Sequence, residues 1–230
     1  MSGDVALIDA VSKHIMRWVG PISLVFHEAT SEIVHVDLHW VASTGDRPFE
    51  VLVTSGMSER PMATPKGEDV PRYAEVCAIL PAGWPLYGPA LDDERNYWPL
   101  QMLKELARHP HVFKTWLGSG HSLNEGAGPA KPFAPNTRLS SVILLESNTL
   151  PKPFQVLRRA PGGREIHFLV AVPLYWEELQ LKLREGTHAL LRAFASHGIT
   201  DRIDPHRANV ALCSYGETKA RHGEEPLEEQ

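Results

Sequence analysis

Cysteine is scarce in this sequence, which contains only Cys77 and Cys213 in 230 residues. Two cysteines cannot form the disulfide framework that stabilises many small secreted domains. Cys77 lies in the apolar stretch 73–80, where a reduced, buried thiol is the usual interpretation. The scarcity of cysteine therefore favours a reducing compartment.

Long apolar runs are also missing. No stretch approaches the ~20 consecutive apolar residues that a membrane-spanning helix needs. The opening residues, MSGDVALIDA, have neither the basic segment nor the apolar segment of a secretory signal peptide. We therefore expect a cytoplasmic protein that does not bind membranes.

A surplus of positive charge is the third absence. The chain has 23 basic and 28 acidic residues, a formal net charge of −5, so it has no broad basic field to hold phosphate backbones. We therefore expect no nucleic-acid partner. With 43% hydrophobic and 22% charged residues, the composition is that of an ordinary globular protein, and the chain is long enough to bury a sizeable core.

Helix and strand patterns are mixed along the chain. Apolar spacing predicts a helix capped by Asp4 and a second helix from Pro99 to Pro110. Two more helices are predicted after Pro173, with Leu183 on a buried face of the first and Thr187 capping the second. Strands are predicted at 33–41, 49–54, 73–80, 139–145, 154–158 and 165–172, the last two as a hairpin.

These elements predict an α+β protein with helices packed on a mixed, mainly antiparallel sheet. No internal repeat or change of composition divides the chain, so we predict a single domain over residues 1–213. Residues 214–230 are charged and nearly free of apolar side chains, so we expect a disordered tail there. Residues 118–137, rich in Gly, Pro, Asn and Ser, are expected to be irregular.

The stretch Val51–Met62 is the least interchangeable part of the chain. A β-branched run leads into Gly56, which can adopt positive φ because it has no side chain. Met57 and Met62 follow, and we expect them to fill gaps in the core or in an interface. Special turns often carry function, but the pattern favours a structural role for this one.

The best metal candidate is the pattern His35-x-Asp37-x-His39. Alternation along a strand puts these three side chains on one face, from which imidazole and carboxylate groups could bind zinc or iron. The other interpretation is a polar outer face opposite an apolar one. We favour the second, because no further ligand set or supporting shell can be identified.

Other catalytic patterns are incomplete. The segment Gly118–Asn124 has Asn where a nucleophile elbow needs its second Gly, and it lacks the Lys of a phosphate-binding loop. His27 and Glu28 lack the second histidine of a zinc-protease helix. Glu177 and Glu178 are neighbours on a helix and point in different directions, which makes a poor acid–base pair. We therefore predict no catalytic, cofactor-binding or metal-binding residues.

A group of aromatic residues allows two interpretations: a binding surface, or packing in the core. The group consists of Trp84, Tyr87, Tyr97 and Trp98. Large aromatic side chains are more often buried than exposed, so packing is the favoured interpretation.

Several short motifs together resemble the suppressor-of-fused-like family. Each motif alone is weak, but their order and spacing are specific, and they extend from about residue 30 to residue 210. The motifs are Val51–Ser58, Tyr73–Glu75, Leu80–Pro85, Tyr97–Pro99, Leu106–Arg108, Gly120–Ser122, Pro132–Phe133, Pro135–Thr137, Pro173–Tyr175, Glu177–Glu178 and Ile203–His206.

The resemblance implies a single α+β domain that works as a protein-interaction module, with no catalytic residues to carry over. Animal members of the family are cytoplasmic regulators that hold a zinc-finger transcription factor between this domain and a second one. Stand-alone bacterial members resemble immunity proteins that neutralise toxins, often nucleases.

The preferred hypothesis is therefore a non-catalytic, immunity- or antitoxin-like protein that occludes a partner protein, such as a secreted nuclease toxin. One alternative is a regulatory module that sequesters a transcription factor. The other is a metal-dependent hydrolase that uses His35, Asp37 and His39.

Overall fold

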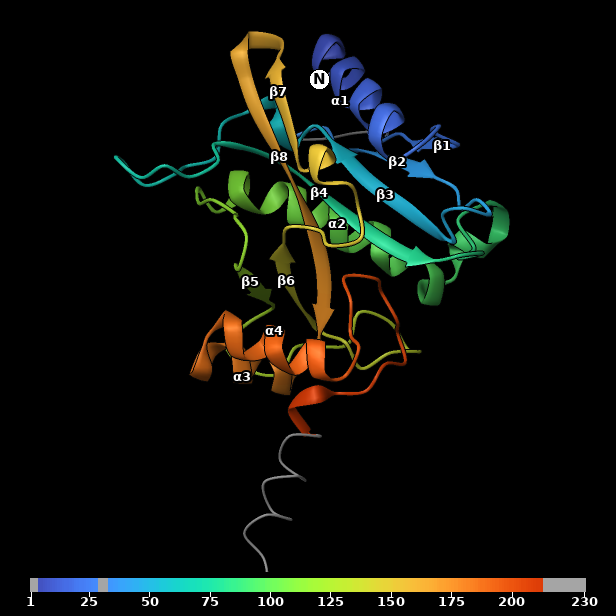
Figure 1. Cartoon of the computed structure of the whole chain (residues 1–230), viewed down its shortest axis with the longest axis vertical. Coiled ribbons are helices and arrows are strands. Elements are labelled where there is room, and N and C mark those ends of the chain that lie inside the picture. The colour runs from blue at the N-terminus through green and yellow to red at the C-terminus, as the bar shows by residue number, and fades with distance from the viewer. Residues whose placement is uncertain (1–3, 29–32, 213–230) are drawn as a thin grey trace, which may run out of the picture.

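The fold is built on an eight-stranded sheet with the strand order β1-β2-β3-β4-β8-β6-β5, in which β7 also pairs with β8 (Figure 1). The computed structural model describes residues 4–28 and 33–212, so the tail predicted at 214–230 lies outside the described residues. The strands are β1 (Leu24–Phe26), β2 (Asp37–Val41), β3 (Phe49–Ser55), β4 (Tyr73–Pro81), β5 (Ser122–Asn124), β6 (Ser141–Leu145), β7 (Val156–Ala160) and β8 (Arg164–Leu174). The helices are α1 (Val5–Trp18), α2 (Glu94–Val112), α3 (Trp176–Glu185) and α4 (Thr187–Ser196).

The predicted fold class is confirmed. Strands β4 and β8 are parallel, and the other neighbours in the sheet are antiparallel, so the sheet is mixed and mainly antiparallel. The hairpin of β7 and β8 forms as expected. In residues 4–28 and 33–212, no helix is both long and apolar enough to cross a membrane.

Both faces of the sheet are covered. On β3, Val51 and Val53 point into a core shared with α1, α3 and α4, whereas Leu52 between them points into a core shared with α2. Figure 1 shows α1 and α2 on opposite sides of the sheet, with α3 and α4 packed together near the end of β8. The central strands are therefore buried on two sides, which explains their nearly continuous apolar sequences.

Helix α2 begins five residues earlier and ends two residues later than predicted. Asp93 caps it by accepting a hydrogen bond from the Arg95 amide, and Pro99 lies inside the helix. A proline cannot donate to the carbonyl four residues before it. Here that carbonyl, on Arg95, accepts a hydrogen bond from the Asn136 side chain at 3.4 Å. A contact from a distant segment thus compensates for the proline.

The other differences concern short elements and helix ends. Strands β1 and β5, each three residues long, were not predicted, and β2 begins at Asp37 instead of residue 33. Gly186 occupies the N-cap of α4, so Thr187 is its first helical residue. Leu183 is 63% exposed, whereas Leu179 and Leu181 are buried. Contacts with α4 and with the sheet set the buried face of α3, and a simple i, i+4 pattern does not predict them.

The turn after β3 is held by the buried carboxylate of Glu75 on β4. Oε1 accepts hydrogen bonds from the Gly56 amide at 3.0 Å and from the Ser58 amide and hydroxyl at 3.0 and 2.6 Å. Oε2 accepts a hydrogen bond from the Thr54 hydroxyl at 2.6 Å. Burial raises the pKa of the Glu75 carboxyl, and these hydrogen bonds oppose that effect. The turn is therefore a rigid part of the core.

Gly56 is required at this turn for two reasons. Its φ is 121°, a value that residues with side chains rarely adopt. A Cβ at this position would lie 1.8 Å from the carbonyl oxygen of His35. Met57 and Met62 are buried in the core beneath α2, as expected.

We predict that Gly56→Val lowers the free energy of unfolding by roughly 3 kcal/mol or more, because the new side chain overlaps the backbone of His35. Urea unfolding measures this loss. Gly67→Val is a matched control, because Gly67 also has positive φ (83°) but has no atom within 4 Å of a Cβ position. Equal losses in the two variants would contradict the close approach to His35.

Candidate functional site

The three residues of the metal candidate do not converge on one point. His35 Nε2 lies 3.0 Å from Asp37 Oδ1, and His27 Nδ1 lies 3.1 Å from Asp37 Oδ2. The third residue, His39, instead pairs with Ser55, its Nε2 lying 2.9 Å from the serine hydroxyl. In the described ranges, no group of three or more His, Cys, Asp or Glu side chains could hold a metal ion.

His39 is almost fully buried, so the expectation of a polar outer face is also wrong for this strand. Asp37 is buried as well. Burial lowers the pKa of His39 to about 4, and the nearby charge of Asp37 only partly opposes this effect. The imidazole is therefore neutral at pH 7 and is part of the buried interior.

The other catalytic candidates have structural partners. The ring of His121 packs against Trp116, with centroids 4.3 Å apart, and the Ser122 hydroxyl accepts a hydrogen bond from Lys182 at 3.0 Å. Cys77 donates to the Leu169 carbonyl, and burial raises the pKa of its thiol. These contacts leave Ser122 and Cys77 without an activating histidine in the described part of the chain.

The two adjacent glutamates on α3 have separate roles. Glu178 is buried and forms an ion pair with Arg207, with Nη2 and Oε2 2.5 Å apart. Glu177 accepts a hydrogen bond from Asn209 at 2.8 Å. Together they attach the segment after α4 to the start of α3, so both carboxylates serve the fold.

The aromatic group is divided between the core and the surface. Trp98 is buried, with its ring stacked on Phe133 at a centroid distance of 5.4 Å and Trp84 packed against it edge to face. Tyr87 is 68% exposed, and Tyr97 is half-buried. Packing explains Trp84 and Trp98, and Tyr97 and Trp98 also line a cavity.

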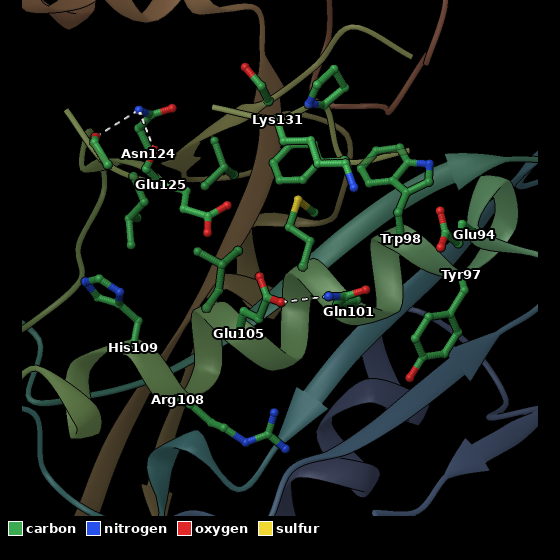
Figure 2. Close-up of a pocket in the computed structure, with 18 of the residues that line it drawn as sticks. Glu94, Tyr97, Trp98, Gln101, Glu105, Arg108, His109, Asn124, Glu125 and Lys131 are labelled. Carbon is green, nitrogen blue, oxygen red and sulfur yellow. Dashed lines mark hydrogen bonds between the residues drawn. The ribbon is translucent and has the colours of Figure 1, made fainter. Parts of the chain in front are cut away.

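This cavity, here called the α2 pocket, lies between α2 and the segment 123–133 and has a volume of about 850 Å³ (Figure 2). Its floor is apolar and includes Met102, Leu106 and Phe133. Its edges include the acidic residues Glu94, Glu105 and Glu125. Among the described residues, it is the strongest candidate for a binding site.

The α2 pocket was missed at the level of the sequence. Leu100, Leu103 and Ala107 account for the stripe of α2 that faces the sheet. Tyr97, Met102 and Leu106 border this stripe and line the pocket, so a wider apolar face of α2 is the signal that the sequence contains. The opposite wall comes from residues expected to be irregular, so only their folded path could identify it.

Comparison with known proteins identifies the fold. A family model described as "Suppressor of fused protein (SUFU)" matches residues 32–208. A search of curated proteins finds no match. The crystal structure of a SUFU homologue from Neisseria gonorrhoeae matches with a TM-score of 0.64 and 14% identity, covering 88% of this chain and 95% of that one.

Two further crystal structures match over 97% of this chain. One is a Sufu–Fu complex, with a TM-score of 0.60, 14% identity and 97% coverage of the matched chain. The other is Drosophila Suppressor of Fused, with a TM-score of 0.57 and 13% identity. This chain covers 59% of the Drosophila chain.

We predict that the neutral, buried His39 makes the protein less stable in acid. The folded pKa of about 4 lies below the ordinary value of 6.5, so between these values the unfolded chain binds a proton that the folded chain excludes. The stability that comes from keeping His39 uncharged in the folded chain is fully present above about pH 6.5 and is lost as the pH falls towards 4. It amounts to about 3 kcal/mol.

Urea unfolding at several pH values between 4 and 7 measures this dependence. Burial also lowers the pKa of His14, His109 and His111, so acid destabilises through several groups. His39→Gln removes one of them and is expected to flatten the pH dependence. An unchanged pH dependence in this variant would contradict the assignment.

Proposed function

The chain belongs to the suppressor of fused protein family, and from this membership we propose that it is a non-catalytic protein-binding domain. One solved relative with this fold is described as part of a Sufu–Fu complex, which is an assembly of proteins. The family match is the observation that carries the proposal. It covers residues 32–208, which include both walls of the α2 pocket.

The contacts of the candidate catalytic residues support a binding role over an enzymatic one. Ser122, Cys77 and Glu178 each have a structural partner. His35 and Asp37 face each other, whereas His39 faces Ser55. A hydrolase that depends on this trio would have to rearrange two buried side chains. The metal-dependent hydrolase is therefore the weaker alternative.

The more specific proposal is an immunity- or antitoxin-like protein that neutralises a partner toxin by covering it, in the cytoplasm where a nuclease toxin would act. The formal net charge of −5 supports this role, because opposite charges speed the encounter with a basic nuclease. Occlusion needs a shaped surface on a rigid domain and no chemistry from it. The α2 pocket offers such a surface.

Co-expression tests the proposal. The immunity role predicts that a toxin is encoded beside the gene. We expect co-expression of the chain with this toxin to restore growth, and we expect the chain to co-purify with an inactive form of the toxin. Sequestration of a transcription factor predicts a different outcome, namely a change in a reporter gene without any protection from the toxin.

A variant of this chain that keeps its fold is a suitable control for this test. The Gly67→Val variant changes a site outside the α2 pocket and is expected to protect as well as the parent protein. Failure of the parent protein both to restore growth and to bind the inactive toxin would contradict the proposed immunity role.

A further inference from the structure

The α2 pocket extends along the whole of α2. Residues that line it recur along one face of α2 at helical spacing, from Glu94 through Gln101 and Glu105 to Val112. At about 1.5 Å per residue these positions span about 27 Å, the length of the helix. A space that follows a whole helix fits an extended or helical segment of chain better than a compact small molecule.

The floor of the pocket offers apolar contacts. Met102 and Leu106 of α2 are buried, and Leu123 and Phe133 on the opposite wall are half-buried. At one end Phe113 is 66% exposed. An occupant that covered these side chains would bury apolar surface, which is a favourable source of binding free energy.

The edges of the pocket carry unbalanced negative charge. Four acidic side chains at its edges are exposed, and within the described ranges none of them forms an ion pair: Asp92, Glu94, Glu105 and Glu125. Of the two basic residues that line it, Arg108 forms an ion pair with Glu28. Figure 2 shows Arg108 leaving α2 on the side away from Asn124 and Glu125. Lys131 is left to oppose the four carboxylates.

The edges of the sheet are less suited to a partner. The strand order ends at β1 and β5, which have three residues each, and β7, which pairs only with β8, has five residues with a register shift between Leu157 and Ala160. Strand addition gains its affinity from a regular row of main-chain hydrogen bonds, and short or irregular edge strands provide few of them. The length, the apolar floor and the acidic edges favour the α2 pocket.

We propose that the α2 pocket binds a basic amphipathic helix of the partner protein. Apolar side chains of this helix lie on the floor, and its Lys and Arg side chains face Glu94, Glu105 and Glu125. Helices bind apolar grooves in this way through side chains spaced three and four residues apart. The inference rests on the proposed function and specifies the chemistry of the partner.

A synthetic probe tests the recognition directly. The probe is an amidated, fluorescently labelled peptide of about 18 residues, with Leu on one helical face and Lys on the other. A second peptide has Glu in place of every Lys. We expect the Lys peptide to bind, to bind more weakly as salt concentration rises, and to outcompete the Glu peptide.

Matched charge reversals locate the site. One variant combines Glu94→Lys, Glu105→Lys and Glu125→Lys, and a control combines Asp46→Lys, Glu68→Lys and Asp69→Lys. All six residues are exposed, and the control residues lie outside the pocket. We expect the first variant to weaken binding of the Lys peptide roughly tenfold or more and the control to weaken it much less. Circular dichroism and urea unfolding check that both variants fold.

The apolar floor has its own test. Phe113→Ala removes an exposed ring at the end of the pocket, so we expect weaker peptide binding with little change in stability. Equal effects of the two charge reversals, or equal binding of the Lys and Glu peptides, would overturn the inference.

The same variants separate this inference from the proposed function. If the pocket variant loses the toxin and the control variant keeps it, both proposals are supported. If the pocket variant still binds and neutralises the toxin, the partner uses another surface, so the inference fails and the proposed function stands. If the parent protein binds the Lys peptide but no toxin, the immunity role fails and the chemistry of the pocket stands.

Discussion

The buried carboxylate of Glu75 determines how the middle of the molecule is assembled. It accepts four hydrogen bonds from residues 54–58 and so fixes the turn between β3 and Met57. The Met57 carbonyl in turn lies 2.8 Å from His111 Nε2, at the end of α2. A buried carboxylate is stable only when its oxygens are satisfied, so the turn, β4 and α2 depend on one another.

Buried carboxylates join other distant segments in the same way. Glu50 accepts hydrogen bonds from the Trp40 indole, from Ser43 and from the Gly83 amide, and so connects two loops at one end of the sheet. Asp201 accepts hydrogen bonds from the loop 147–149. Each acidic group replaces the water that the loop amides would otherwise bind. The acidic residues that hold loops therefore differ from the exposed acidic residues at the α2 pocket.

This division bears on function. Acidic side chains that hold loops cannot be released for catalysis without exposing unpaired donors, which costs several kcal/mol. The acidic side chains beside the α2 pocket do not hold loops. They are exposed and form no ion pair within the described ranges. A rigid scaffold that presents free charge and apolar surface suits the binding of a partner. It also agrees with a family match that covers residues 32–208, whereas the low identities of the solved relatives define only the fold.

The sequence by itself determined the class of the fold, the hairpin of β7 and β8, the need for Gly56 and the family, because these depend on local geometry and on apolar spacing. Only the tertiary structure decided which polar side chains are buried: Asp37 and His39 alternate along β2 like an outer face, but both are buried in the folded chain. The partners of Glu75 lie 17 to 21 residues away in sequence, and the α2 pocket joins segments about as far apart. Such contacts follow from how the chain folds back on itself, and no spacing within one segment encodes them.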